Sequence, residues 1–299
     1  MHSRSWVLCL TLVTACGGGA SSTHTATPAG TYEIRLTRHA SVGVSWGEAT
    51  HFAEIQQTVV HDAAGTVVAD TTSATTIVLS GEYTVLTVGP DGDPMRLRLV
   101  VQSFTVDSGE GPATPTMPSA LVIDRGPDGG ITGENGEALD PALVTVLRSV
   151  VPDHAPPVDD DLVFGTRDPQ AVGASWPIDS AGAARGLAAL QLSVDPSNVT
   201  GNTTLVAAGN EDGHDILELR SVIAAHHVGM PGLPAGSVEQ RADLLAGIDM
   251  ILPTDTSLPP LREMERSAVD VQVVVPSPSG PQTVDVSVRQ EATHMRTLR

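Results

Sequence analysis

The sequence VGASWP occupies residues 172–177, near the middle of the chain, and VGVSW occurs at residues 42–46, which is 130 residues earlier. Four of the five shared positions are identical, and the two segments contain two of the three tryptophans. Each segment precedes β-type sequence with an Asp-Gly hairpin signal, at Asp91-Gly92 and at Asp212-Gly213. The repeat predicts two related halves, each opening with a short strand that a buried tryptophan anchors, Trp46 or Trp176.

Period-2 alternation of apolar and polar residues extends outward from both segments and is typical of half-buried strands. Tyr32, Ile34 and Leu36 alternate with polar residues in the first half. The expected strands are 52–60, 66–79, 83–88, 95–106, 203–208, 216–225 and three longer ones at about 237–252, 262–275 and 282–297. Alternating valines on the last two, from Val269 and from Val284, indicate one apolar face.

Helices are expected at two places only. Asp140 and Pro141 form a good helix start, with an N-cap aspartate and proline at the first helical position, and predict a helix over 141–151. Residues 180–192 are rich in Ala and Leu, although Gly182 and Gly186 weaken this helix. Strands and helices do not alternate as in a parallel α/β sheet. We therefore predict a mainly β (α+β) fold, with antiparallel sheets of long strands and short helices over one face.

The chain divides into an N-terminal β-rich half at 31–151, a Pro- and Asp-rich linker at 152–170, and a C-terminal half with a helix and antiparallel strands at 171–299. Asp and Glu outnumber Lys and Arg by 35 to 16, and the net charge is −19. Such an acid excess repels nucleic-acid phosphates and anionic lipid head groups. Nucleic acid is therefore excluded as a partner.

The N-terminus has the form of a secretory signal at 1–15, with Arg4, a short apolar run and small residues. Residues 13–16, Val-Thr-Ala-Cys, resemble the lipobox of bacterial lipoproteins, in which the cysteine is acylated. Cys16 would be the sole cysteine after cleavage, so it has no disulfide partner. Residues 16–30 read as a flexible Gly/Ser/Thr tether. The resemblance implies membrane attachment through a palmitate-type lipid on Cys16 and, with Gly17 as the second mature residue, the outer membrane.

The lipobox, the tether, the VGASWP segment, the Ala/Leu helix and VTGNTTLV at 199–206 together resemble uncharacterised bacterial lipoproteins that contain a domain of unknown function. The resemblance is clearest over 170–299 and implies no activity and no site residues. The predicted architecture is also similar to bacterial lipoprotein-carrier and lipid-binding lipoprotein folds, but a fold does not determine a function.

Residues 43–47, Gly-Val-Ser-Trp-Gly, match the G-x-S-x-G pattern of serine hydrolases. In those enzymes the serine lies on a sharp strand-to-helix turn. Here the flanks predict antiparallel strands, and the second copy has Pro177 in place of the last glycine. A structural repeat explains both copies, whereas a hydrolase with Ser45 as nucleophile explains one.

Other chemistry-bearing residues have simpler interpretations. His226 and His227 would point to opposite faces of a strand, which disfavours a shared metal with His214. Residues 159–161 and 124–137 contain several acids, but Asn135 replaces the glutamate that an EF-hand requires, so solvated loop acids are the favoured interpretation. The sequons at Asn198 and Asn202 are read as turn chemistry.

The sequence thus predicts a lipid-anchored extracytoplasmic protein that is not an enzyme and has no cofactor and no metal. Two functions stay open. The first is a carrier whose sheet face holds a lipid or other amphiphile, since a core with only 3% aromatic residues can leave an apolar gap. The second is a structural or interaction protein of the envelope with a fully packed core.

Overall fold

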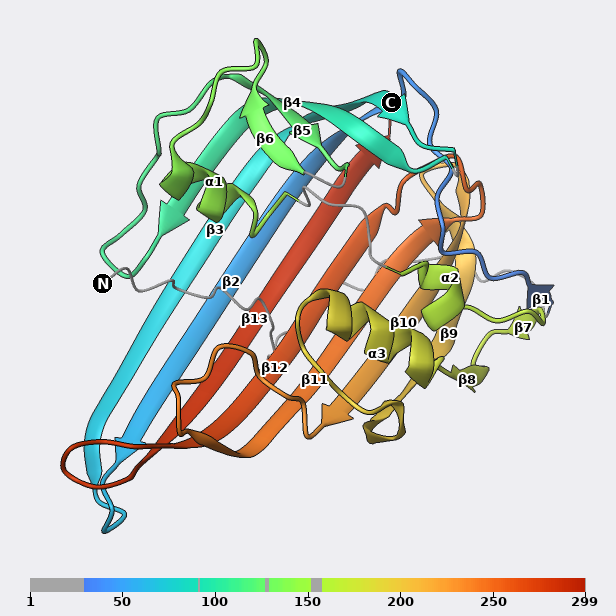
Figure 1. Ribbon diagram of the computed structural model, residues 1–299. Helices are drawn as coiled ribbons and strands as arrows, with labels where there is room; N and C mark the ends of the chain where they lie inside the picture. The colour runs from blue at the N-terminus through green and yellow to red at the C-terminus, as the bar shows by residue number, and fades with distance from the viewer. Residues whose placement is uncertain (1–29, 91, 127–128, 152–157, 299) are drawn as a thin grey trace.

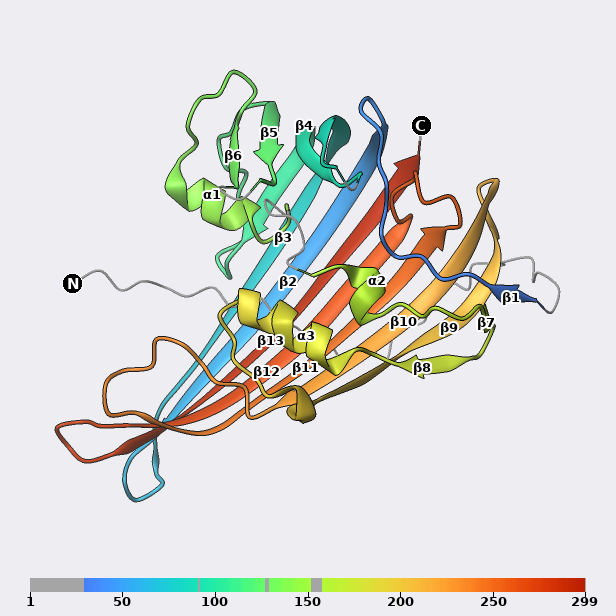
Figure 2. The same ribbon diagram turned by 45° about the vertical axis from the view of Figure 1, so that its right-hand side comes forward.

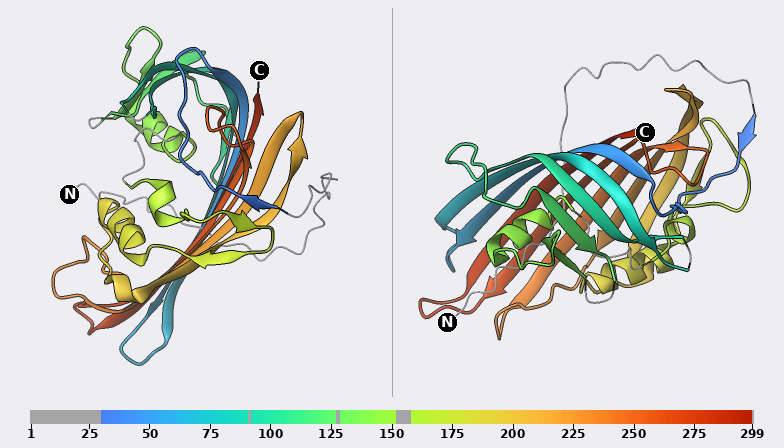
Figure 3. Two further views of the ribbon diagram at one scale, coloured as in Figure 1. Left: turned by 90° about the vertical axis from the view of Figure 1, so that its right-hand side faces the viewer. Right: turned by 90° about the horizontal axis from the view of Figure 1, so that it is seen from above.

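A computed structural model describes residues 30–90, 92–126, 129–151 and 158–298 (Figure 1). One sheet of eleven strands dominates it, in the order β6-β5-β4-β3-β2-β13-β12-β11-β10-β9-β8, and every neighbouring pair is antiparallel. The chain is therefore mainly β, and its large sheet is antiparallel as expected. Figures 2 and 3 show the sheet twisted and curved along its length.

The elements have the following bounds. The large sheet contains β2 (Ser45–His61), β3 (Val67–Val88), β4 (Pro94–Asp107), β5 (Ala120–Asp124), β6 (Gly130–Gly133), β8 (Ser175–Pro177), β9 (Val199–Glu211), β10 (His214–His226), β11 (Val238–Pro253), β12 (Arg262–Val275) and β13 (Gln282–Leu298). A second sheet pairs β1 (Thr31–Tyr32) with β7 (Gln170–Ala171). The helices are α1 (Pro141–Leu147), α2 (Asp160–Val163), α3 (Ser180–Ala189) and the 3-10 turn η1 (Pro196–Asn198).

The two expected halves share this one sheet. Strands β2 to β6 are neighbours in chain order, and so are β8 to β13. The halves join where β2 pairs with β13, from His61 opposite Thr283 to Trp46 opposite Leu298. We call this β2–β13 contact the seam. It places the first long strand of the chain beside the last one.

Buried side chains gather on one face of the sheet, which we call the inner face. On β2 it carries Trp46, Glu48, Thr50 and Phe52, and on the other strands their cross-strand neighbours. Two apolar clusters lie along it. The first, around Trp176, includes side chains of β8 to β12, α2 and α3. The second, around Trp46, includes side chains of β2 to β6 and α1.

The start of α1 confirms the predicted N-cap at Asp140. Asp140 accepts a hydrogen bond from Ala142 N at 2.7 Å, and α1 begins at Pro141. Asp179 accepts from Ala181 N at 3.0 Å ahead of α3. The three late strands match their expected ranges to within a residue or so. Asp212 and Gly213, with φ angles of 52° and 85°, form the β9–β10 hairpin turn that the sequence predicts.

One expected break is absent. Residues 66–79 and 83–88 belong to the single 22-residue strand β3 instead of two strands. The register with β4 shifts at Ser80/Gly81, where Gln102 is an extra residue of β4, so the bulge lies opposite these residues and β3 continues through them. A Cβ on Gly81 would lie 2.6 Å from the Val100 carbonyl oxygen, which explains why glycine occupies this close approach. Turn-type residues can thus mark bulges as well as strand ends.

The expected linker at 152–170 contains a packed element. Helix α2 lies in it, and Val163 and Phe164 are buried in the Trp176 cluster. Asp161 Oδ1 accepts a hydrogen bond from Leu36 N at 2.6 Å, which ties the segment to the first half of the chain. Ile34 and Leu36 are buried as their alternation predicts, although only Thr31–Tyr32 of that stretch is a strand.

No helix within the described parts of the chain is long and apolar enough to cross a membrane.

Candidate functional site

The two tryptophan segments have the same local geometry. Gly43 N donates to Val85 O at 2.9 Å, and Val85 N donates to Val44 O at 2.9 Å. In the second copy, Gly173 N donates to Leu205 O at 2.8 Å and Leu205 N to Ala174 O at 3.0 Å. The φ angles of Gly43 and Gly173 are 87° and 86°, a region that favours glycine. The repeated sequence therefore encodes a repeated backbone structure.

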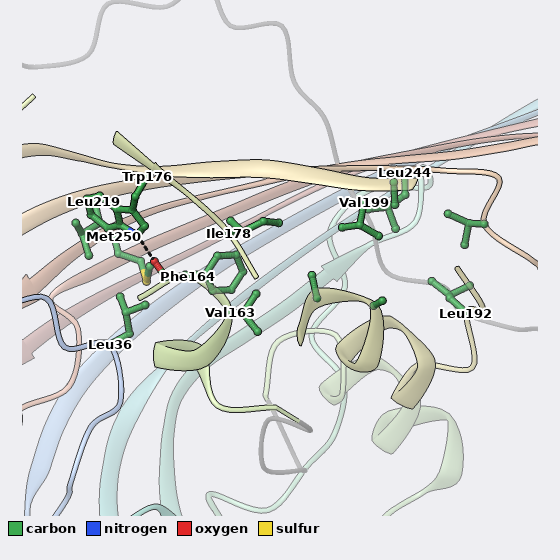
Figure 4. Close-up of a cluster of buried hydrophobic side chains, with 14 of the residues drawn as sticks. Leu36, Val163, Phe164, Trp176, Ile178, Leu192, Val199, Leu219, Leu244 and Met250 are labelled. Atoms are coloured by element: carbon green, nitrogen blue, oxygen red, sulfur yellow. Dashed lines mark hydrogen bonds between the residues drawn. The ribbon is translucent and has the colours of Figure 1, made fainter. Parts of the chain in front are cut away.

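Both indole rings are buried, with 6% exposure for Trp46 and 8% for Trp176, and each N–H has an acceptor. Trp46 Nε1 donates to Glu48 Oε2 at 2.8 Å, and the ring stacks on Tyr83 with centroids 5.6 Å apart. Trp176 Nε1 donates to the Phe164 carbonyl oxygen at 2.8 Å, as Figure 4 shows. Their role as stability anchors stays a prediction.

The expectation of two equivalent units is wrong beyond these segments. Trp46 opens β2, a central strand of 17 residues, whereas Trp176 lies in β8, a three-residue strand at the sheet edge. The strands that follow the two copies therefore do not match in length or in position.

Ser45 is the first residue of β2, where it lies opposite Thr84 of β3. It neighbours Trp46 along the strand, so its side chain points to the face opposite the inner face. A nucleophile elbow requires a strand-to-helix turn, and Ser45 instead begins a long strand. This geometry gives no support to a hydrolase.

A group of charged side chains lies on the inner face at the seam, between the two apolar clusters. Glu48 of β2 is its centre. His294 Nδ1 lies 2.9 Å from Glu48 Oε1, and Arg296 Nε donates to Glu48 Oε2 at 2.8 Å. Thr50 Oγ1 lies 3.4 Å from Glu48 Oε1 and 3.2 Å from His294 Nδ1. Side-chain exposure is only 6% for Glu48 and 12% for His294 and Arg296.

Arg296 extends this group to the next strand. Its Nη1 and Nη2 atoms each lie 3.4 Å from Glu263 Oε2 of β12, and Nη1 also donates to Pro260 O at 3.3 Å. Glu265, two residues further along β12, lies on the same face between Ile248 and Ala292. We call Glu48, Glu263, Glu265, His294 and Arg296 the seam cluster.

Electrostatics divide the seam cluster into paired and acid-rich parts. Burial alone would raise the pKa of Glu48, but the Arg296 charge and hydrogen bonds from His294 and Trp46 outweigh it and lower this pKa to about 2. Burial lowers the pKa of His294, and its hydrogen bond and attraction to Glu48 outweigh burial and raise it. Glu48 is therefore a carboxylate that the Arg296 charge and the hydrogen bonds from His294 and Trp46 stabilise.

Glu265 and Asp160 show the opposite behaviour. Enclosure by protein raises the pKa of Glu265 to about 7, and the neighbouring Glu263 charge adds to the effect. Enclosure also raises the pKa of Asp160 on α2 to about 6, again with Glu263 adding to it. Both side chains nevertheless keep accessible surface. Both are exposed to solvent, so protein surrounds them without close packing on their carboxyl groups.

Beyond the seam cluster, the same two strands become apolar. Val269, Val271 and Val273 of β12 lie directly opposite three valines of β13, in the pairs Val269–Val288, Val271–Val286 and Val273–Val284. Ser267 and Gln290 lie between these pairs and the cluster. Val284 and Val286 are half-buried, whereas the β12 valines are buried. We call this charged-to-apolar stretch of β12 and β13 the inner strip.

A separate open groove of about 360 Å³ lies beside β4 and is lined by residues 101–104 and 114–119. Its apolar lining includes Phe104, which belongs to the Trp46 cluster, and Met117, which packs against that cluster. Its volume is within the range of small-molecule sites, but it is open where such sites enclose their ligand.

The candidate metal ligands are dispersed. His214 begins β10, His226 ends it with Nδ1 at 2.9 Å from Asp243 Oδ1, and His227 follows in a turn. Among the described residues, no three or more His, Cys, Asp and Glu side chains are placed to hold a metal ion. Cys16, the expected lipidation site, lies outside the described residues.

The remaining acidic and amide residues serve as local hydrogen-bonding groups. Asp159 caps α2 by accepting from Asp161 N at 2.9 Å, so this acidic run has a structural use beyond that of solvated loop acids. Asp124 Oδ1 accepts from Gly126 N at 2.9 Å in the β5–β6 turn. Asn202 Nδ2 donates to Ser175 Oγ at 3.0 Å, and Asn198 lies in η1.

Comparison with known proteins identifies no family. No family model and no curated protein matches the sequence. Thirteen chains of solved structures match, among them lipovitellin, described as "lipid-protein interactions in lipovitellin", with a TM-score of 0.39 and 7% identity. That alignment covers 86% of this chain and 25% of the lipovitellin chain, so this chain spans about a quarter of the length of its neighbour.

The sequence patterns did not predict the seam cluster. Its members are up to 248 residues apart in sequence, and the β2–β13 pairing brings them together. A signal was present in part, because Glu48 and Thr50 alternate with Ser45, Gly47 and Ala49 in phase with the buried Trp46 and Phe52. Polar residues at strand positions that share a face with buried residues indicate a hydrogen-bonded network.

Proposed function

We propose that this chain is a lipid-anchored, non-catalytic protein of the cell envelope that binds an amphiphile along the inner strip. The observation that carries the proposal is the change from charged to apolar side chains along one face of β12 and β13. Glu263 and Glu265 lie at one end and Val269, Val271 and Val273 at the other, on alternate residues of one strand.

The dimensions of the inner strip suit a head group joined to an acyl chain. Strands rise about 3.4 Å per residue, so Glu265 and Val269 are roughly 14 Å apart along β12 and the valine rows are roughly 14 Å long. Val284 and Val286 keep part of their surface accessible. In this proposal, α2 and α3 cover one face of the sheet, and a ligand chain fits beside α3 against these valines. Each buried methylene would contribute about 0.8 kcal/mol.

The charges around Glu265 and Asp160 select the head group. Arg296 and His294 are already paired with Glu48, whereas enclosure by protein, with the nearby Glu263 charge adding to it, raises the pKa of Glu265 to about 7 and that of Asp160 to about 6. A carboxylate or phosphate head would meet like charges there. A cationic amine would relieve the repulsion, so we propose an amphiphile with an amine or other cationic head.

Binding can be measured with a pair of probes of equal chain length, a fluorescent alkylammonium amphiphile and a fluorescent fatty acid. We expect saturable binding of the alkylammonium probe and much weaker binding of the fatty acid. Affinity for the cation should rise from pH 5 to pH 8, because Glu265 and Asp160 ionise as the pH passes their pKa values of about 7 and about 6.

Two matched variants locate the site. Val286→Asp places a charge on the inner strip and should weaken binding about tenfold or more, since each methylene withdrawn from apolar contact costs about 0.8 kcal/mol. Val222→Asp places the same charge on the opposite face, where Val222 is exposed, and should leave binding unchanged. Equal effects of both variants, or stronger binding of the fatty acid, would contradict the proposal.

A specific observation favours a second candidate, an envelope structural protein without a ligand. Val269, Val271 and Val273 are already buried by the chain itself, with 4–8% exposure. Native mass spectrometry of the protein purified from its own membrane distinguishes the candidates. A co-purified amphiphile supports the carrier, and a protein free of small molecules that also binds neither probe supports the structural role.

The membrane anchor is proposed from the lipobox-like residues 13–16 and from Cys16 as the lone cysteine that remains after cleavage. Replacing Cys16 with Ser should abolish incorporation of a radioactive fatty acid and leave the precursor uncleaved. Sucrose-gradient fractionation of the wild-type protein should place it with the outer membrane. Labelling of the Cys16→Ser variant at the wild-type level would exclude this anchor.

A further inference from the structure

The edges of the large sheet are unequally protected. Its two terminal strands are short: β6 has four residues, and β8 has three and ends in Pro177. Natural sheets use short edge strands and proline to prevent pairing with other chains. Strand β3 differs, because β4 covers it only from Thr76 to Val88. Within the described chain, Val67–Thr75 pairs with β2 on one side and has no strand on the other.

We call residues 67–75 the open edge. Residues 67–74 are all exposed, including Val67 and Val68 at 53% each. The sequence VVADTTSAT contains β-branched residues that favour strands, no proline and a single charged residue, Asp70. Lysine, proline and short length, three usual protections of an edge strand, are absent there, and the one register shift with β2, where Val68 is the extra residue, lies at its first end. The open edge is therefore a template for one more strand.

We propose that the open edge is the interface between two copies of this chain, which pair antiparallel about a two-fold axis near Thr71. The segment that one copy presents and the edge that β4 leaves free on the other are the same nine residues, Val67–Thr75, so their lengths match. This pairing places Val68 opposite Ala74 and Asp70 opposite Thr72. It brings no two charged side chains into direct opposition, whereas like charges in such positions destabilise a strand pair.

Charge also favours this part of the molecule as the contact between copies. The whole chain carries a net charge of −19, so two copies repel each other. Between residues 55 and 75, however, the acids are only Asp62 and Asp70, and Asp70 already accepts a hydrogen bond from Gln57 at 3.1 Å. Contact at the open edge therefore places little charge at the interface. The remaining long-range repulsion is screened by salt.

The expected dimer has one continuous sheet with both inner faces on the same side. A single nine-residue strand pair buries less area than a standard interface, so the association should be weak and reversible, in the micromolar range. The inference does not depend on the proposed amphiphile, because the open edge lies on β3 and the inner strip on β12 and β13.

Sedimentation equilibrium of the full chain tests the interface, with Cys9→Ser and Cys16→Ser as a common background to exclude thiol and lipid effects. We expect a monomer–dimer equilibrium that strengthens as salt concentration increases. Thr71→Lys should weaken the dimer about tenfold or more, because it places two like charges at the two-fold axis. Thr87→Lys is the matched control: Thr87 is exposed on the same strand, but β4 covers it, and the dimer should be unaffected.

Disulfide trapping gives an independent result. Thr71→Cys in the same background should form a covalent dimer under mild oxidation, since cysteines directly opposite on paired strands can be bridged. Val42→Cys, which is 61% exposed and far from the open edge in sequence, should not form one efficiently. A protein that stays monomeric at high concentration and high salt, or a dimer that Thr71→Lys leaves intact, would overturn the proposal.

Discussion

The segments at 42–46 and 172–176 have nearly the same sequence and the same backbone hydrogen bonds, yet they begin different structures. The first leads into β2, a 17-residue strand with neighbours on both sides. The second leads into β8, which ends at Pro177 on the sheet edge. The residue after the tryptophan accounts for this difference, because Gly47 keeps its N–H for the ladder and Pro177 has none. A short motif thus determines local geometry, and its neighbours determine its place in the sheet.

Of the changes that test this comparison, truncating the tryptophans should lower the free energy of unfolding most. Truncation of a buried Trp to Ala costs about 3–5 kcal/mol, and we expect this loss for both Trp46→Ala and Trp176→Ala. Trp46→Ala should cost a further ~1 kcal/mol, because it also removes the stacking on Tyr83. Urea unfolding gives both values. A loss below about 1 kcal/mol at either site would show that the indole is not an anchor.

Substituting the residue after each tryptophan shows how strongly the backbone is constrained at each position. Gly47→Pro removes an N–H and constrains the backbone in a strand paired on both sides, so it should cost about 3 kcal/mol or more. Pro177→Gly at the edge should change the free energy of unfolding by only about 1 kcal/mol or less. Equal effects in urea unfolding would mean that the two strands are equally constrained.

The acceptors of the two indole N–H groups differ as well, since Trp46 uses the Glu48 side chain and Trp176 uses a backbone carbonyl. Glu48→Gln keeps the shape but removes the charge that His294 and Arg296 require. It should cost about 2 kcal/mol, the usual range for hydrogen bonds to charged groups. Glu134→Gln, at the exposed Arg98 pair, is the matched control and should have little effect. A stable Glu48→Gln variant would show that the seam cluster tolerates a neutral centre.

The pH dependence of stability should come from the seam cluster and Asp160. The pKa of His294 is raised, so its stabilising contribution is complete below the unfolded value of about 6.5 and is lost as pH rises through the folded value. The raised pKa values of Glu265 (about 7) and Asp160 (about 6) act in the same direction, because ionisation is disfavoured in the folded state. The Glu48 contribution is lost only as pH falls toward its pKa of about 2.

We therefore expect lower stability at pH 8 than at pH 5, and Glu265→Gln should reduce the difference. Thermal unfolding at several pH values measures it. A wild-type protein that becomes more stable from pH 5 to pH 8 would contradict the assigned electrostatics.

The smallest expected change in stability concerns α3. This helix follows Trp176, whereas a long strand follows Trp46. Gly186 lies in this helix, and a Cβ there would meet only Val158 Cγ2 at 3.8 Å, an ordinary contact. Gly186→Ala should therefore stabilise the protein by up to about 1 kcal/mol, the helix propensity difference. Gly182→Ala is the control, because its Cβ would lie 2.9 Å from Asp179 Oδ2, and it should bring no gain. Stabilisation by Gly182→Ala alone would contradict this packing.

The elements that the sequence predicted well depend on interactions within a few residues. The cap at Asp140, the Asp212-Gly213 turn and the period-2 strands are of this kind. The helix within the expected linker was missed because α2 has only four residues and its stability comes from buried Val163 and Phe164. Short elements owe little to local propensity, and tertiary packing decides whether they form.

The sequence by itself determined most of the long strands, the Asp212-Gly213 turn and the shared backbone structure of the two tryptophan segments, because alternation, caps and turns act locally. Only the tertiary structure decided that both halves join in a single sheet, with Glu48 between His294 and Arg296. Any strand edge offers the same pattern of N–H and C=O groups, so local sequence does not specify which strand will be its neighbour. Cooperative burial of the inner face selects β13 as the partner of β2, and the charged groups of the seam follow from that choice.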